Sequence, residues 1–295
     1  MSILSASAIA YGAATVVNAI ATGRGAALGV DLWTKAKVEL TDEPGVIEGR
    51  ILSDPGEDTN LIKRVVKRVL RRFRAEGEHG ASVETSSNIP IARGMKSSSA
   101  AANAISVATV AALRKKLSDL EMVKLGVDAA KDAGVTITGA FDDACASYFG
   151  NIVVTDNVAQ QVKRRFRVRG GYAVLFHVPS SKMYTAQSNV EKIRMMAPLV
   201  DLAYREALLG RYWSAMTFNG LIYSAALDYN VKVAVDALAA GAIAAGISGK
   251  GPAIAAVVPE ISIAEVKEAW NPFEGEVIQA RVNRVRAHVV GKDDG

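Results

Sequence analysis

The feature that most constrains this chain is a run of glycine, lysine and serine placed directly before an alanine-rich helix. The segment "PIARGMKSSSAAANAI" covers residues 90–105, and its helical pattern continues to about residue 113. The first turn of a helix carries backbone N–H groups without partners, together with the positive end of the helix dipole. A helix that begins at the serines therefore predicts an anion-binding site, such as one for a phosphate group.

An ordinary helix cap explains the same residues without any ligand. Ser97 or Ser98 is well placed to act as the N-cap of a helix over residues 98–113. In the anion-binding interpretation, Gly94 lets the backbone approach closely, Lys96 adds a positive charge, and a serine hydroxyl reaches a phosphate-bound Mg²⁺. No G-x-x-x-x-G-K-[ST] pattern occurs in the chain, so any nucleotide site here differs from a Walker A loop.

Two other glycine-containing stretches carry charged residues. In "TGAFDDACASYFG", Asp142 and Asp143 are adjacent among apolar residues, where paired carboxylates are costly unless a cation or a hydrogen-bond donor meets them. One of them is a candidate to orient a substrate hydroxyl or to accept its proton, although an aspartate before a helix is also a common cap. The stretch "GISGKGPA", residues 246–253, fits either an anion-holding bend or a plain helix-to-strand turn.

The rest of the composition supports few other kinds of site. The three histidines are scattered without ligand spacing, so neither a histidine metal site nor a Ser-His-Asp triad is predicted. The single cysteine, Cys145, rules out an internal disulfide and fits a buried core position better than a nucleophile. No segment has the pattern of a signal peptide or the apolar length of a membrane span, so we expect a cytoplasmic protein without a membrane partner.

The net charge of +5 and the pI of about 9.2 come largely from two local clusters. Residues 58–76 have apolar side chains at helical spacing with arginine and lysine between them, which predicts an amphipathic helix with a solvated basic face. Residues 162–171 alternate basic residues with Phe166 and Val168, as on the exposed face of a strand. Because neither cluster is interleaved with stacking aromatic residues, we expect no nucleic-acid partner.

Strand-like and helical patterns are mixed along the chain without strict alternation. Strands are predicted within residues 26–40, 43–54, 81–89, 172–179, 246–260 and 276–290, and helices at 58–76, 98–113, 117–133, 190–209, 212–228, 231–245 and 262–270. A bend rich in glycine and aspartate is expected between the β-branched runs of residues 134–157. This mixture favours an α+β fold with partly antiparallel sheets. A change of composition after Asn157 favours two domains, residues 1–160 and 161–295.

The three motifs, in this order, resemble the GHMP superfamily of small-molecule kinases. The central phosphate loop of that family, P-x-x-x-G-L-G-S-S-A-A, corresponds to residues 90–100, with Lys96 in a glycine place and Ser99 in place of the first alanine. These departures, together with "YGAATVVNAIATGRGAALGVDL", "TITGAFDDACASYFG" and "GISGKGPAIAAVV", resemble one branch closely, the archaeal-type shikimate kinases.

The resemblance implies a two-domain fold, with an N-terminal α/β domain like ribosomal protein S5 and a C-terminal ferredoxin-like α+β domain. It also implies transfer of the γ-phosphoryl group of ATP to the 3-hydroxyl of shikimate, with Mg²⁺ as cofactor. The ATP and phosphate contacts would come from Pro90, Ile91, Ala92, Arg93, Gly94, Met95, Lys96, Ser97, Ser98, Ser99 and Ala100. The implied catalytic residues are Lys96 and Asp142, and Ser98 stands where the family has its Mg²⁺-binding serine.

The resemblance is incomplete at two places. Where related kinases carry a glutamate as metal ligand, this chain offers Asp132 at a similar distance, and the lysine of their first motif is missing. The acceptor contacts would come from Asn18, Thr22, Gly23, Arg24, Asp142, Ser248, Gly249, Lys250 and Gly251. Lys250 and Arg24 are the candidates for holding the shikimate carboxylate, and Arg24 equally fits a solvated turn.

Two alternative functions share this fold. A GHMP kinase for another small alcohol, such as homoserine or mevalonate, is disfavoured by Lys96 and by "TGAFDDA". A non-catalytic binding protein would not need Ser98 together with a carboxylate at Asp142, because no phosphoryl group would be transferred between them.

Overall fold

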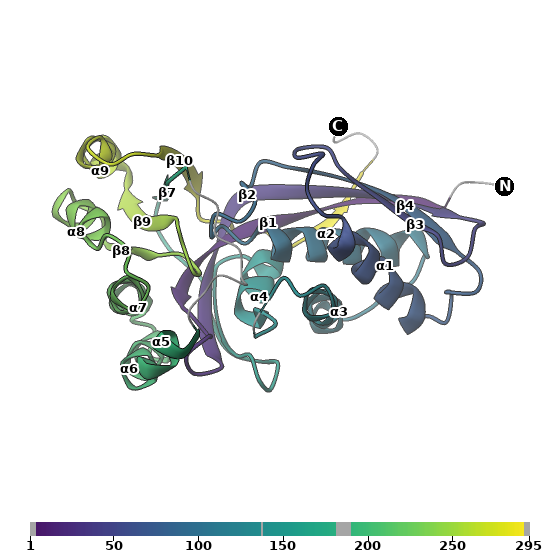
Figure 1. The fold of residues 1–295 in the computed structure, drawn as a ribbon, viewed down its shortest axis with the longest axis horizontal. Helices are drawn as coiled ribbons and strands as arrows, with labels where there is room; N and C mark the ends of the chain where they lie inside the picture. Colours follow the sequence, from purple (N-terminus) through teal and green to yellow (C-terminus); the bar gives the residue numbers. More distant parts are fainter. Residues whose placement is uncertain (1–3, 137, 181–189, 292–295) are drawn as a thin grey trace.

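The computed structural model describes residues 4–136, 138–180 and 190–291, which form two sheets with helices packed against them. In Figure 1 the larger sheet and its helices form the right-hand part of the molecule, mostly in purple to teal with a yellow segment from the end of the chain, and the smaller sheet and its helices form the left-hand part, mostly in green. The mixed, mostly antiparallel architecture agrees with the predicted α+β class.

The larger sheet is built around two long strands, β1 (Ser5–Val17) and β2 (Arg24–Thr41), which pair in antiparallel fashion. β4 (Gly80–Ser87) and β5 (Ile152–Asp156) pair with different halves of β2. The remaining strands are β3 (Ile47–Ile51), parallel to β4, β6 (Gln161–Phe166), antiparallel to β5, and β11 (His288–Val290), antiparallel to β1. The turn between β1 and β2 therefore lies at the end of the sheet where β5 also ends.

Four helices cover one face of this sheet, α1 (Asn60–Arg72), α2 (Ser97–Ala112), α3 (Asp119–Asp132) and α4 (Phe141–Phe149) (Figure 1). α2 is buried on nearly every side, because its small alanine side chains allow β1, β2 and the neighbouring helices to approach closely. α1 buries one apolar face and leaves its arginines and lysines toward solvent, which confirms the predicted amphipathic helix.

The smaller sheet has the order β10-β7-β9-β8, and all its pairs are antiparallel. Its strands are β7 (Tyr172–Val178), β8 (Ala244–Ile247), β9 (Ile254–Pro259) and β10 (Glu276–Arg281). The helices of this part are α5 (Val190–Met195), α6 (Ala197–Leu208), α7 (Tyr212–Ala226), α8 (Lys232–Ala239) and α9 (Ile263–Trp270), with a 3-10 turn η2 (Glu260–Ser262). α7 lies directly on β8, since a Cβ on Gly220 would stand 2.2 Å from the Cα of Gly246. This close contact brings the loop after β8 to the larger sheet.

Four local predictions differ from the structure. β1 was not predicted, because its inward side chains are mostly alanine and valine among Ser, Thr and Gly, which lack a clear alternating pattern. The helix expected at residues 190–209 is broken at Met196, just before Pro198. The expected bend after Gly139 continues as α4, and the helix expected to reach residue 245 ends at Ala239, ahead of β8.

The two sheets do not divide the chain at residue 160. β6 and β11 both lie in the stretch that we assigned to the second domain, yet both belong to the larger sheet. The strand expected at residues 276–290 is split, so that β10 joins the smaller sheet and β11 the larger one. The chain thus returns to its first sheet after completing the second.

Candidate active site

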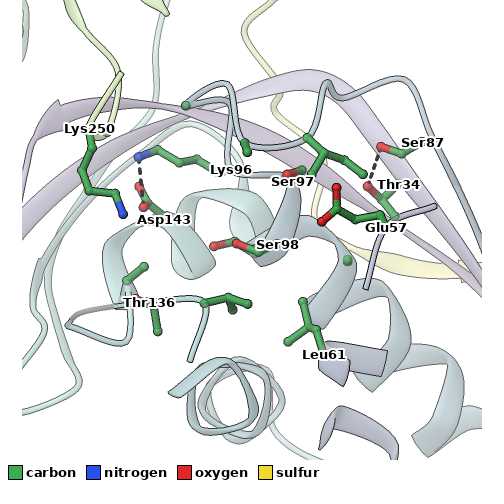
Figure 2. Close-up of a pocket in the computed structure, with 18 of the residues that line it drawn as sticks. Thr34, Glu57, Leu61, Ser87, Lys96, Ser97, Ser98, Thr136, Asp143 and Lys250 are labelled. Atoms are coloured by element: carbon green, nitrogen blue, oxygen red, sulfur yellow. Dashed lines mark hydrogen bonds and ion pairs between the residues drawn. The ribbon is translucent and has the colours of Figure 1, made fainter. Parts of the chain in front are cut away.

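A cavity of about 560 Å³ lies where the three motifs meet (Figure 2). Its walls come from β1, β2, β4, the start of α1, the loop before α2, the segment before α4 and the loop after β8. The predicted site residues that line it are Asn18, Ile91, Ala92, Gly94, Lys96, Ser97, Ser98, Ser99, Asp142, Gly249, Lys250 and Gly251. The fold therefore brings together all three motifs, although they are far apart in the sequence.

The N-terminus of α2 opens into this cavity. Lys96 occupies the N-cap position in the left-handed region, with φ of 65° and ψ of 36°, and makes no capping hydrogen bond through its side chain. The serines therefore do not fill the N-cap position, and the simple capping explanation is wrong. Ser97 and Ser98 instead line the cavity, where the N–H groups of the first helical turn and the helix dipole favour an anion.

The loop before α2 is held in place by the loop after β8. Ser248 Oγ donates a hydrogen bond of 2.7 Å to the carbonyl oxygen of Gly94 and accepts one of 3.2 Å from the backbone N–H of Thr15. Gly94 has a φ of +88°, and a Cβ there would lie 2.4 Å from the carbonyl oxygen of Ser248. Ser248 is fully buried, so its hydroxyl joins the loops and does not face a substrate.

Asn18 makes a similar structural connection. Its side-chain amide donates a 2.7 Å hydrogen bond to the carbonyl oxygen of Gly249, and its backbone N–H donates to Asn219 Oδ1 at 2.9 Å. The Asn18 side-chain oxygen accepts a bond from the backbone N–H of Ile20 at 3.0 Å. Although Asn18 lines the cavity, its amide is already engaged in holding the third motif against the first.

Asp142 is the buried member of the acidic pair. It lies in the first turn of α4 and is 3% exposed. Burial and, next, the negative charge of Asp143 raise the pKa of Asp142, and together with the opposing hydrogen bond from Asn157 and charge of Lys96 they bring this pKa to about 7. A carboxyl group with a pKa near neutrality can accept a proton from a bound hydroxyl and release it again.

Asp143 is paired with Lys96, whose Nζ lies 3.1 Å from Asp143 Oδ2 (Figure 2). Lys250 extends toward the same carboxylate from the loop after β8 (Figure 2). Burial and, next, the positive charge of Lys96 lower the pKa of Lys250, and with the opposing charge of Asp143 this pKa is about 8. Lys96 is paired with Asp143, and Lys250 adds a second positive charge to the same cavity, so an anion there would be attracted.

The turn between β1 and β2 was predicted to contact the acceptor, but the structure keeps it out of the cavity lining. Arg24 Nη2 lies 2.6 Å from Asp201 Oδ1, and the guanidinium stands over the ring of Tyr204 at 5.2 Å. Thr22 Oγ1 accepts a bond of 3.3 Å from the backbone N–H of Arg24, and the carbonyl oxygen of Gly23 accepts one of 2.9 Å from Asn157. These residues hold the turn and link it to α6.

Asp132 also lies outside the cavity lining. Its carboxylate forms an ion pair of 2.7 Å with Arg68 Nε, and this bond lowers the pKa of Asp132. Asp132 is therefore paired with Arg68, whereas Ser98 lines the cavity, and we do not include Asp132 among the groups that we propose for the metal ion.

Within the phosphate loop, several predicted contacts serve the loop itself. Met95 and Ala100 are fully buried in the core. Arg93 Nη1 donates a hydrogen bond to the carbonyl oxygen of Pro179 and is absent from the lining, as is Pro90. The loop residues that line the cavity are Ile91, Ala92, Gly94, Lys96, Ser97, Ser98 and Ser99.

The other end of the cavity is apolar and was not predicted. In Figure 2, Leu61, Thr34, Ser87 and Glu57 lie away from Lys250 and Asp143. The apolar residues that line the cavity also include Ile51, Ile62, Ile91 and Ala101. The side-chain oxygens of Thr34 and Ser87 lie 2.9 Å apart. An apolar wall with a few hydroxyl groups suits a flat heterocyclic ring. The sequence carries no distinct signal for it, because each residue looks like an ordinary strand or helix position.

The charged end of the cavity fits a polyphosphate with a divalent cation. Asp143 Oδ1 is buried without a hydrogen-bond partner among the described residues, and Ser98 offers a hydroxyl in the same cavity. Oxygen ligands of this type suit Mg²⁺. In residues 4–136, 138–180 and 190–291, no group of three or more His, Cys, Asp or Glu is arranged to hold a metal ion by itself. Across the same ranges, no helix has the length and apolar character to cross a membrane.

Family models and sequence relatives agree on one group of proteins. The model described as "GHMP kinases N terminal domain" matches residues 60–151, and "GHMP kinases C terminal" matches residues 201–276. A protein of Methanosarcina mazei named shikimate kinase is 47% identical over 278 residues, which cover 94% of each chain. A protein of Pyrococcus furiosus with the same name is 43% identical over 268 residues, covering 90% of this chain and 95% of its own.

Solved structures show the same fold at low sequence identity. Homoserine kinase from Cytophaga hutchinsonii superposes with a TM-score of 0.73 and 17% identity, covering 97% of each chain. Mevalonate kinase from Methanococcus jannaschii gives a TM-score of 0.72 and 18% identity, covering 95% of this chain and 98% of that one. At such identities the superposition establishes the fold, while the substrate has to be argued from the site.

Proposed function

We propose that this chain, which belongs to the GHMP kinase family and to its branch of archaeal shikimate kinases, transfers the γ-phosphoryl group of ATP to the 3-hydroxyl of shikimate. The products are shikimate 3-phosphate and ADP. The resemblance predicted from the three motifs is confirmed by the family models and by the relatives at 42–48% identity. The observation that carries the proposal is one cavity that joins the open N-terminus of α2, two lysines and the buried carboxylate of Asp142.

The phosphate chain of ATP is proposed to lie at the N-terminus of α2. The N–H groups of the first turn, the helix dipole and Lys96 would neutralise charge on the transferred group, which is most of what phosphoryl transfer requires of a protein. The nucleobase is proposed to fill the apolar end near Leu61 and Ile62. The hydroxyls of Thr34 and Ser87 stand at that end as hydrogen-bonding groups (Figure 2).

A bound Mg²⁺ would neutralise phosphate charge and align the γ-phosphoryl group. Ser98 and the unpartnered oxygen of Asp143 are the groups that we propose to hold it. Because Asp143 Oδ2 is paired with Lys96, the same carboxylate would connect the cation to the lysine beside the phosphates.

Asp142 is proposed to receive or orient the proton of the acceptor hydroxyl. Its pKa of about 7 leaves a substantial ionised fraction at neutral pH, and this fraction rises as the pH rises. Lys250 is the candidate for the shikimate carboxylate, because it lines the cavity whereas Arg24 pairs with Asp201. Since its pKa is about 8, Lys250 is mostly protonated at pH 7 and can pair with the acid.

The test is an ADP-release assay with Mg-ATP and one acceptor at a time. Shikimate alone should give turnover, with homoserine and mevalonate in parallel as the alternative acceptors of this fold. Turnover with homoserine or mevalonate and none with shikimate would retain the phosphate site and overturn the acceptor. If the folded protein binds ATP but phosphorylates neither shikimate, homoserine nor mevalonate, the result supports a non-catalytic binding protein with this fold. We propose that the enzyme works in the cytoplasm, where ATP is supplied, in line with the expectation from its sequence.

A further inference from the structure

One buried amide clamps Asp142 at two points. Asn157, which is 1% exposed, follows β5 and was not singled out in the sequence. Its Nδ2 donates a 2.7 Å hydrogen bond to Asp142 Oδ1, and its Oδ1 accepts a 3.2 Å bond from the backbone N–H of Asp142. A single side chain therefore fixes both the carboxylate and the backbone at the start of α4.

The orientation of this amide is determined by its surroundings. The backbone N–H of Asp142 can only donate, so the group that faces it must be the amide oxygen of Asn157, and the amino group must then face the carboxylate. The hydroxyl of Thr155 lies 2.7 Å from the same amide oxygen, and the backbone N–H of Asn157 donates to Gly23 at 2.9 Å. The carbonyl oxygen of Thr155 accepts a bond of 3.1 Å from the Tyr204 hydroxyl on α6. Asn157 is thus held by Thr155 and Gly23, and Thr155 is in turn bonded by Tyr204 from the other part of the molecule.

The second carboxylate oxygen has equally little freedom. A Cβ on Gly25 would lie 2.2 Å from Asp142 Oδ2, so β2 approaches this oxygen as closely as a glycine allows. The Asp142 side chain lines the cavity while one oxygen is fixed by Asn157 and the other lies against Gly25. Such a carboxylate has one orientation only, which suits a group that must meet a substrate hydroxyl.

We propose that Asn157 is a positioning residue for phosphoryl transfer, which holds the Asp142 carboxylate in one orientation. The inference rests on the function proposed above for its rate measurement, but the orientation of the Asp142 carboxylate can be tested without turnover. Asn157 touches neither substrate in this proposal and acts through Asp142 alone.

The experiment compares Asn157→Leu with Asn103→Leu. Asn103 is also fully buried and also bonds to α4, through the carbonyl oxygen of Ala144 and the hydroxyl of Ser147, but it does not contact Asp142. In Asn157→Leu, we expect kcat to fall by about tenfold or more while KM for ATP stays within about twofold of the wild type, because the phosphate site is not altered. A crystal structure of the ligand-free variant should show the Asp142 carboxylate in a different rotamer or in more than one. Asn103→Leu should lower thermal stability and leave both kcat and the orientation of the Asp142 carboxylate unchanged.

Two results would overturn the proposal. One is an Asp142 carboxylate that keeps its wild-type orientation in Asn157→Leu, and the other is a loss of kcat that is reproduced by Asn103→Leu. If Asn157→Leu does not fold, Thr155→Val leaves the amide in place but removes the hydroxyl that holds it, and a fall in kcat with KM for ATP unchanged is then required. A variant structure in which the carboxylate turns away, together with a wild type that does not phosphorylate shikimate, would overturn the acceptor and leave the clamp intact.

Discussion

The two ends of the cavity differ in how much of their chemistry is visible in the sequence. The charged end is made of Lys96, Asp142, Asp143 and Lys250, which are all partly or wholly buried charges on glycine-rich segments. The apolar end is made of strand and helix positions that any α+β protein could carry. A buried charge is costly and needs a reason, whereas a buried leucine does not, so the first end can be predicted from a sequence and the second requires the fold.

The largest expected effect is at the charged end, from Asp142→Asn. This change keeps the shape of the side chain and can keep the Asn157 bond but removes the proton acceptor, so kcat should fall about a thousandfold while ATP binding is retained.

The same substitution should increase the thermal stability of the protein. The folded-state pKa of Asp142 is raised to about 7, so the ionised carboxylate destabilises the fold increasingly as pH rises from about 4 to 7. The melting temperature of the variant should therefore exceed that of the wild type at pH 8 and approach it at pH 4, which calorimetry at both pH values measures. A near-normal rate would remove Asp142 from the mechanism.

Lys96→Ala should have the next largest effect. It removes one positive charge from the N-terminus of α2 and leaves the Asp143 carboxylate without its 3.1 Å partner, so kcat/KM for ATP should fall by about 10–100-fold. Steady-state kinetics at varied ATP concentration measures it. Lys163→Ala is a suitable control, because Lys163 lies on the exposed face of β6. An unchanged kcat/KM in Lys96→Ala would mean that the charged end does not contact the phosphates.

Leu61→Glu probes the apolar end. A carboxylate in that wall would be desolvated by a nucleobase, so KM for ATP should rise by about tenfold with kcat little changed. Leu52→Glu serves as its control, since Leu52 is 57% exposed and lies outside the lining. If Leu61→Glu alters KM for shikimate and not for ATP, the two ends have been assigned the wrong way round.

The smallest effect is expected from Arg24→Ala, because Arg24 lies at neither end of the cavity. Arg24 pairs with a partly exposed Asp201, and such pairs contribute about 0–1 kcal/mol, so kcat and both KM values should stay within about twofold of the wild type. A rise of tenfold or more in KM for shikimate would place the turn between β1 and β2 in the acceptor site after all.

The elements with strong periodicity were predictable, and those determined by close packing were not. An apolar stripe among arginines predicts α1, and a glycine- and serine-rich segment before an alanine-rich run predicts α2. β1 and β8 were not predicted, because alanine and glycine at a close contact have little intrinsic preference for a helix or a strand. In such segments the tertiary contacts determine which of the two forms.

The same distinction holds within the site. Lys96, Asp142 and Lys250 could be selected by their chemistry in context, and the structure brings them to one cavity. Asn157 could not, since an asparagine after a strand is most often a turn residue, and only the fold places its amide against a carboxylate fifteen positions earlier. Asp132 was selected by distance along the chain, which does not determine where a helical residue faces.

The return of the chain to its first sheet has a consequence for biosynthesis. β11 pairs with β1, and the segment before it bonds to the opposite strand, where the backbone N–H of Asn283 donates to Gly29 at 2.9 Å. A nascent chain that has emerged only to residue 160 would display the β1 edge unpaired. The larger sheet is therefore complete only after residues 288–290 have been translated and can pair with β1.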